Sequence, residues 1–268
     1  MKLSFNLHVF IATCAGAILL VSILSAVFRL RPEKSEVKQI SLSSIKGLFE
    51  APSGSVYFMY SKNSPNDYVL YAKIFNMCKN KPQLECYYSL NDLYVDNYGC
   101  PRPNVISSGK YMVFIGGPIS QPSVDYYEKS LQAPCSLEYN STHIWWKSRN
   151  GSIIQKSVME LSKINEHHDV FIVEFFTDDY EREVFVCYGY GWRGTWIAVE
   201  YFCKVIYPNI EKYTDSFYIF EWIDLNDDKF PDVNEVFEEW LAGAYHSPMK
   251  KKANMLLGYY KKLGGEEK

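Results

Sequence analysis

Short apolar runs alternate with polar turns along most of the chain, and the runs show two periodicities. Runs typical of strands occupy residues 56–60, 86–94, 111–115, 170–176, 183–188 and 216–223. Apolar residues at helical spacing occupy residues 67–79, 124–131, 195–207 and 233–244. Residues 135–165 are more polar, and we expect strands and loops there. Because strands alternate with helices, the pattern predicts an α/β fold in which a mixed sheet is flanked by helices.

The first thirty residues follow a different pattern. Residues 5–28 contain no Asp, Glu, Lys or Arg, and about 20 apolar residues are enough to cross a bilayer. A cleavable signal peptide has a shorter apolar core and small residues before its cleavage site. Here the one candidate cleavage site, at Ser25, is preceded by the large residues Ile23 and Leu24, which do not suit cleavage. We therefore expect an uncleaved transmembrane helix that contacts the lipid bilayer through residues 5–28.

These patterns divide the chain into four parts. We expect a membrane anchor over residues 1–30, a charged stalk over 31–54, an α/β ectodomain over 55–248 and a basic tail over 249–268. The tail reads as a partly amphipathic helix with two groups of lysines. Such a helix is usually solvated, and the alternative is that it rests on an anionic lipid or polymer.

Composition narrows the classes of protein. Hydrophobic residues make up 47% of the chain and charged residues 22%, which excludes wholesale disorder. The formal net charge is −3, and a nucleic-acid-binding protein usually has a basic excess. We therefore expect no nucleic-acid partner.

Two features of the sequence predict opposite orientations of the anchor. Four basic residues follow the predicted span: Arg29, Arg31, Lys34 and Lys38. The positive-inside rule would place the domain behind them in the cytoplasm. Against this, six cysteines lie beyond the span, and Asn140 and Asn150 begin acceptor sequences for N-glycosylation. An even cysteine count with such acceptors is typical of an oxidising exterior, so we expect an extracellular domain with disulfides, whose pairing the sequence leaves open.

An acidic loop carries the strongest chemical signal. Oxygen-bearing side chains and one backbone carbonyl fall at positions 1, 3, 5, 7, 9 and 12 of a twelve-residue segment: Asp224, Asn226, Asp228, Phe230, Asp232 and Glu235. This is the spacing of a calcium loop. Lys229 stands at the sixth position, where such loops normally have Gly. We expect these six residues to bind Ca²⁺, and the alternative is a solvated acidic turn that caps the following helix.

Other motifs indicate structure rather than catalysis. Gly189, Gly191 and Gly194 have the G-x-G-x-x-G spacing of dinucleotide-binding turns, but Trp192 crowds the phosphate approach. We interpret this segment as a turn followed by a helix that Thr195 caps. Residues 167–169 are interpreted as a solvated turn. No nucleophile, base and orienting group can be assembled from the sequence, so we expect no enzymatic activity.

Three segments together resemble archaeal S-layer proteins. They are Ser55–Ser64 followed by a helix from Asp67, Val113–Pro122 with its Gly-Gly-Pro turn, and Val184–Thr195 with its glycine turn. The resemblance implies an α/β module outside the cell membrane, without enzymatic activity, in or beneath a surface layer that calcium commonly supports. The chain is shorter than a full lattice protein and has a predicted anchor, which favours a membrane-anchored relative.

The leading hypothesis is a single-pass envelope protein with a structural or interaction role. Its partners would be other surface-layer or envelope proteins, including further copies of itself. The alternative is a membrane-anchored extracellular receptor for a ligand, or an ectoenzyme, built on the same sheet.

Overall fold

The structure is a computed structural model that describes residues 40–241, apart from 52–53, 65–66, 81–83 and 155–156. All described residues belong to one compact unit that begins at Lys38. The predicted membrane span and the basic tail lie outside the described residues. Across the described ranges, no helix combines the length and the apolar character needed to cross a membrane.

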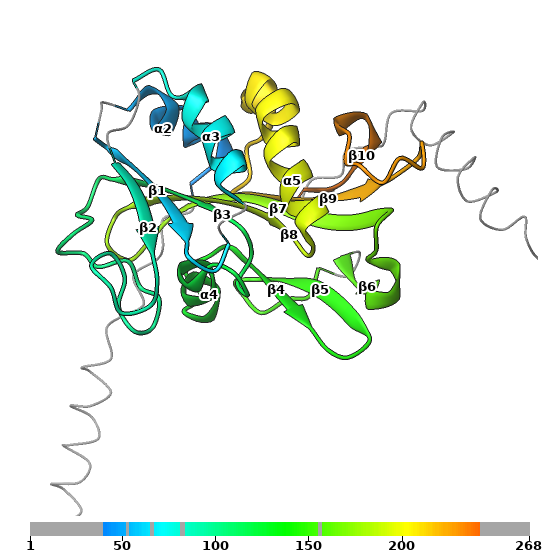
Figure 1. The fold of residues 1–268 in the computed structure, drawn as a ribbon, viewed down its shortest axis with the longest axis horizontal. Coiled ribbons are helices and arrows are strands. Elements are labelled where there is room, and N and C mark those ends of the chain that lie inside the picture. The colour runs from blue at the N-terminus through cyan, green and yellow to red at the C-terminus, as the bar shows by residue number, and fades with distance from the viewer. Residues whose placement is uncertain (1–39, 52–53, 65–66, 81–83, 155–156, 242–268) are drawn as a thin grey trace, which may run out of the picture. The chain divides into compact units, whose positions relative to one another are not determined.

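The described residues of this unit form two sheets and four α-helices (Figure 1). The main sheet contains β1 (Val56–Ser61), β2 (Leu84–Tyr88), β3 (Tyr111–Ile115), β7 (His168–Thr177), β8 (Glu183–Gly189), β9 (Phe217–Ile223) and β10 (Val236–Leu241). The small sheet contains β4 (Cys135–Tyr139), β5 (His143–Ser148) and β6 (Met159–Glu160). The helices are α2 (Lys46–Glu50), α3 (Tyr68–Met77), α4 (Pro122–Lys129) and α5 (Trp192–Tyr201). Beyond α5 the chain continues through a π-helical turn, Phe202–Ile206, and a 3₁₀ turn, Tyr207–Lys212.

The main sheet is mixed, with the strand order β10-β9-β7-β8-β3-β1-β2. The four strands β2, β1, β3 and β8 run parallel to one another, whereas the pairs β8–β7, β7–β9 and β9–β10 are antiparallel. The prediction of an α/β fold around a mixed sheet is therefore confirmed. Because β1, β3 and β8 are adjacent and parallel, their carboxyl ends lie at the same edge of the sheet.

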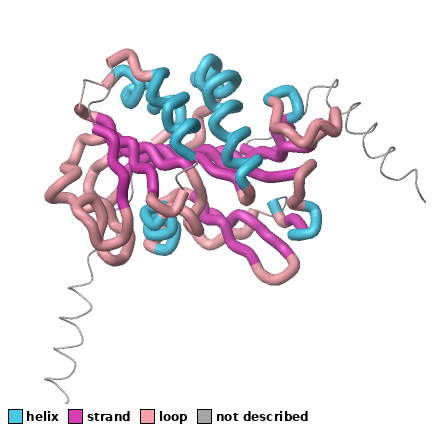
Figure 2. Tube along the Cα trace, in the orientation of Figure 1, coloured by secondary structure: helices cyan, strands magenta, loops and turns pink. Residues whose placement is uncertain are grey.

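Both faces of the main sheet are covered. In Figures 1 and 2, α3 and α5 lie on one face, and α4 with the small sheet lies on the other. Strand β7 shows the consequence: Phe171 and Val173 belong to one apolar core, and Val170 and Ile172 belong to the other. A strand buried on both sides reads as a continuous apolar run, which is the pattern of residues 170–176 apart from Glu174.

Part of the predicted stalk belongs to the domain. The charge of residues 31–54 predicts a stalk, but a 3₁₀ turn over Leu42–Ile45 leads directly into α2. The side chains of Leu42, Ile45, Leu48 and Phe49 are fully buried in the core beside α5. The backbone N–H of Leu42 also donates to the carbonyl of Asp215. The apolar residues of this segment are thus core residues.

The helix expected over residues 233–244 is wrong. A 3₁₀ turn over Val233–Glu235 leads into strand β10, which pairs antiparallel with β9. Val236 and Phe237 are buried, and Val236 is opposite Trp222. Pairing with the edge of the sheet satisfies the backbone there, and this tertiary contact overrides the helical spacing of the apolar residues.

The predicted disulfides are not formed. All six cysteines in the described residues are free thiols: Cys78, Cys86, Cys100, Cys135, Cys187 and Cys203. Cys78 and Cys187 lie in the core on the α3 and α5 side, whereas Cys86 and Cys135 lie in the opposite core. The sheet separates these two groups, so a disulfide between them would have to cross it.

Candidate functional site

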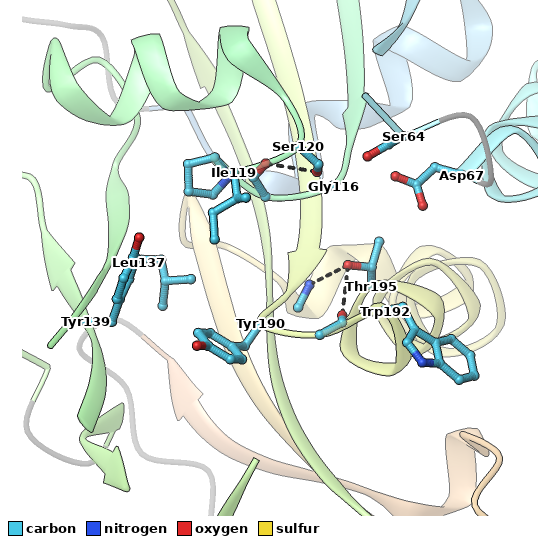
Figure 3. Close-up of a pocket in the computed structure, with 14 residues that line it drawn as sticks. Ser64, Asp67, Gly116, Ile119, Ser120, Leu137, Tyr139, Tyr190, Trp192 and Thr195 are labelled. Carbon is cyan, nitrogen blue, oxygen red and sulfur yellow. Dashed lines mark hydrogen bonds between the residues drawn. The ribbon is translucent and has the colours of Figure 1, made fainter. Parts of the chain in front are cut away.

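A crevice of about 260 Å³ opens where β1, β3 and β8 end (Figure 3). The chain leaves β1 towards α3 on one face of the sheet and leaves β3 towards α4 on the other face (Figure 1). Ligands of open α/β sheets bind where successive connections depart to opposite faces, outside the carboxyl ends of the strands. This crevice is therefore the candidate functional site.

Two glycines make the floor of the crevice possible. Gly116 has a φ of +105°, which side chains rarely tolerate, and follows directly after β3. A Cβ on Gly189 would lie 2.2 Å from the Cα of Gly194. The strand end and the start of α5 touch at this point. The prediction that a glycine turn after residue 188 leads into a helix is confirmed, and the helix begins at Trp192.

Three loops and one strand of the small sheet supply the walls. The lining residues are Ser64, Asp67, Gly116, Gly117, Pro118, Ile119, Ser120, Leu137, Tyr139, Gly189, Tyr190, Gly191, Trp192 and Thr195. Figure 3 shows Ser64 and Asp67 on one side of the crevice and Leu137 and Tyr139 on the other. The crevice thus has an acidic wall and an apolar, aromatic wall.

Asp67 is the one charged side chain among these described lining residues. Burial raises the pKa of its carboxyl to about 6, and a hydrogen bond from Ser64 acts in the opposite direction. A carboxyl with a raised pKa in a cleft is a recognised mark of a functional site. The sequence pattern predicts Asp67 at the start of a helix, and no local signal shows that its side chain faces a crevice.

The start of α5 is closed by an internal carboxylate. Asp169 on β7 accepts hydrogen bonds from the backbone N–H groups of Gly191, at 3.0 Å, and Gly194, at 2.8 Å. Asp169 is 2% exposed, and burial raises its pKa to about 6 against the effect of these hydrogen bonds. A helix start is a favourable place for an anion. Here Asp169 already occupies it, which agrees with the rejection of a dinucleotide site.

The interpretation of residues 167–169 as a solvated turn holds for His167 but is wrong for His168 and Asp169, which belong to β7. Asp169 is buried beneath α5, and His168 bonds to Glu221 on β9 through its Nε2 atom, at 2.7 Å. Thr195 also differs from its predicted role as the cap of α5. The residue before the helix is Gly191, and the Thr195 hydroxyl accepts from Gly189 N–H while donating to the Gly191 carbonyl.

The acidic loop folds back on itself after β9. Asp224 is buried and accepts hydrogen bonds from the backbone of Asp227 and Lys229, at 2.8 and 2.9 Å. Glu235, also buried, reaches back to the backbone N–H groups of Leu225 and Asn226. The first and last predicted ligands therefore both face the turn.

The remaining predicted ligands lie on the exposed side of this loop. Asn226 and Asp228 each accept a hydrogen bond from the N–H two residues further on, and Asp232 does the same with Asn234. The Phe230 ring is 51% exposed and contacts the Trp196 ring edge-on. These bonds stabilise the turn that calcium ligation would also need.

A residue outside the predicted ligand set joins the loop. His167 donates or accepts at 2.8 Å from Asp224, and Asp227 lies 3.4 Å from the same ring nitrogen. His167, Asp224 and Asp227 can place one ligand atom each within 4.8 Å of the others, and this is the metal-type grouping found within the described ranges. The proximity of His167 could not be read from the sequence, because 57 residues separate it from Asp224.

A second group of acids is buried between the main sheet and the small sheet. Glu174 on β7 is fully buried, and neither of its carboxyl oxygens has a hydrogen-bond partner among the described residues. Glu128 on α4 is 6% exposed and accepts hydrogen bonds from Tyr188 and from the backbone of Leu137. Burial raises both pKa values, that of Glu128 to about 8 and that of Glu174 well above its ordinary value. Glu174 interrupts the apolar run 170–176, which was the sequence signal for it.

The two glycosylation acceptors lie on exposed turns. Asn140 is in the turn between β4 and β5, and Asn150 is in the turn after β5. Each asparagine side chain accepts a hydrogen bond from the backbone two residues further on, at Thr142 and Ser152. Both turns are accessible on the surface.

Comparison with known proteins gives no relative: no family model, no curated protein and no solved structure matches this chain.

Proposed function

We propose that the protein is a non-enzymatic, single-pass envelope protein whose α/β domain lies outside the cell and has a structural or interaction role in or beneath a surface layer. The observation that carries this proposal is the exposure of Asn140 and Asn150 in turns at the two ends of β5. A glycosylation acceptor has to lie in an accessible loop, and both acceptors of the domain do.

The crevice supports a binding role for this domain. It brings together one carboxyl, hydroxyl groups and aromatic rings, at the edge where α/β sheets hold their ligands. This observation also favours the second candidate function, an extracellular receptor for a small ligand. The two candidates are compatible, because an envelope protein can hold a ligand as part of its attachment.

Calcium is part of the proposal. Asp224, Asn226, Asp228, Asp232, Glu235 and the Phe230 carbonyl would supply the hard oxygen ligands that Ca²⁺ prefers. Carboxylate oxygens accept more than one hydrogen bond, so the oxygens that hold the turn retain lone pairs for a cation. Lys229 takes a φ of +62° at the position that normally requires Gly, and its ammonium group pairs with Glu166 rather than with the loop. These features fit an oxygen-ligated cation.

Protease protection of intact cells tests the location. A protease that cannot cross the membrane should remove an epitope at the C-terminus while a cytosolic control protein survives. Intact mass of the purified chain tests glycosylation, and Asn140→Gln and Asn150→Gln should each remove one glycan mass. Protection in intact cells with digestion after lysis would place the domain in the cytoplasm and refute the proposal.

A further inference from the structure

We propose that the crevice at the ends of β1, β3 and β8 binds a small organic ammonium ligand, with Asp67 as the counter-ion of the ammonium group and the aromatic wall as the contact for its apolar body. This inference deepens the interaction role proposed above and rests on it for its biological meaning. The binding itself can be measured independently of where the domain lies.

The charge of the crevice favours a ligand with a positive charge. Asp67 carries the one charged side chain among the described lining residues, and Ser64 is the hydrogen-bond partner of its carboxyl. A partly buried carboxylate loses hydration, and an ammonium group at hydrogen-bond distance restores the lost stabilisation. A ligand with a positive end therefore complements this wall.

The start of α5 disfavours a ligand with a negative charge. Its free N–H groups would attract an anion, but Gly191 and Gly194 donate to Asp169. An anionic ligand in the crevice would meet Asp67 directly and Asp169 behind the Gly191 backbone. Both carboxylates would repel it. Phosphate-bearing ligands are thus disfavoured at a place where α/β folds often bind them.

The apolar, aromatic wall opposite Asp67 favours a ligand whose remaining part is apolar. Leu137, Tyr139 and Tyr190 line the side opposite Asp67 (Figure 3). Tyr139 is 54% exposed on this wall. Burying such rings against an apolar ligand is favourable, and small-molecule sites usually combine an apolar lining with a few polar groups that fix orientation. A ligand with an ammonium at one end and an apolar body at the other matches both walls.

The ionisation of Asp67 gives the site a pH dependence. With a pKa of about 6, the carboxyl is largely neutral in acid and charged above neutrality. The titratable groups that interact with it are Tyr71 on α3 and Cys187 on β8, and burial raises the pKa of both well above their usual values. Neither group titrates near pH 6, so the binding of an ammonium should weaken as the pH falls through about 6.

Three ligands of similar shape but different charge test whether the crevice prefers a cation. We would titrate the purified full chain in detergent with 2-phenylethylamine, 2-phenylethanol and phenylacetate, and follow binding by calorimetry at pH 7.5. The amine should bind at least about tenfold more tightly than the alcohol, which is the ratio that about 1.4 kcal/mol of ion-pair stabilisation gives. The carboxylate should bind more weakly than the alcohol.

Two variants and a pH series locate the site. Asp67→Asn should reduce amine affinity about tenfold and leave the alcohol unchanged, and Asp179→Asn, at an exposed position outside the crevice, is the matched control. If Asp67→Asn does not fold, the fall in amine affinity of the unaltered chain below pH 6 serves as the test. Equal binding of amine and alcohol, no measurable binding of the amine, or a pH-independent affinity would overturn the inference. Protease protection would then still decide the proposed function separately.

Discussion

The two buried glutamates beneath the sheet should make the domain more stable in acid than at neutral pH. Glu174 has no hydrogen-bond partner in the described residues, and Glu128 is bonded to Tyr188 and Leu137. The groups that act on this pair are Cys135, Tyr188 and the carboxyls of Asp125 and Glu138. The nearby ammonium groups of Lys129 and Lys147 pair with Asp125 and Glu138 instead. The two glutamates are therefore expected to be neutral in the folded state.

The direction in which stability changes with pH follows from the difference between the pKa values of the folded and unfolded states. A carboxyl whose pKa is raised by folding binds its proton more tightly in the folded state, so its contribution is complete below the unfolded pKa and is lost as the pH rises. For Glu128 the window runs from 4.5 to about 8. The free energy of unfolding should fall by about 3 kcal/mol between pH 4.5 and pH 7, and by about 5 kcal/mol in total above pH 8, from Glu128 alone.

Replacing the carboxyl by an amide removes this loss. In Glu128→Gln the amide can accept from the Leu137 N–H and donate to the Tyr188 hydroxyl, so the hydrogen bonds survive without an ionisable group. We expect the variant to match the parent at pH 4.5 and to exceed it by about 3 kcal/mol at pH 7. Urea denaturation of the full chain in detergent, at both pH values, measures the difference.

The control is Glu181→Gln, because Glu181 lies exposed in the turn before β8. It should change the free energy of unfolding by less than about 0.5 kcal/mol at either pH. A parent chain whose stability is flat or rises between pH 4.5 and pH 7, with Glu128→Gln following the same curve, would refute the argument.

Three further predictions address the calcium loop, the buried ion pair and the glycine contact. Millimolar Ca²⁺ should raise the melting temperature of the full chain, and Asp224→Asn should abolish this shift; a melting temperature that EGTA leaves unchanged would show that the loop needs no metal. Arg182 is fully buried and donates a hydrogen bond to Asp178. Arg182→Met would leave the buried Asp178 carboxylate without its cation, so we expect it to destabilise the domain by roughly 3–5 kcal/mol. A loss of stability below about 1 kcal/mol in urea denaturation would contradict this. Gly189→Ala should cost roughly 1–3 kcal/mol, because the new Cβ meets the backbone of Gly194, and a smaller loss in denaturation would contradict this.

The strands of the sheet were predictable because they are buried on both faces. Residues 111–115, 170–176 and 183–188 are apolar apart from Glu174 and Glu183, and such runs admit few alternatives to a central strand. The edge of the sheet was not predictable in this way. Residues 236–241 have the spacing of a helix, and only the unpaired edge of β9 makes them a strand.

The candidate site was harder to predict because its parts are distant in the sequence. The glycines after β3 and β8 were recognisable as turns, but nothing local shows that Asp67 faces them. Asp169 was likewise misread, because the N–H groups that it caps belong to residues 22 and 25 positions further on. Hydrogen bonds of this kind depend on the order of strands, which the sequence pattern left open.

Three acids of this domain share one property. Burial raises the pKa of Asp67, Asp169 and Glu128 alike, and the three lie in the crevice, under α5 and beneath the sheet. Each therefore favours the folded state in acid, and their effects add where the sites do not touch. Among these three acids, Asp67 lines the crevice, so the ammonium ligand that we propose would offset its stability cost at neutral pH. We therefore expect this ligand to stabilise the domain more at neutral pH than in acid, because it binds the ionised carboxyl.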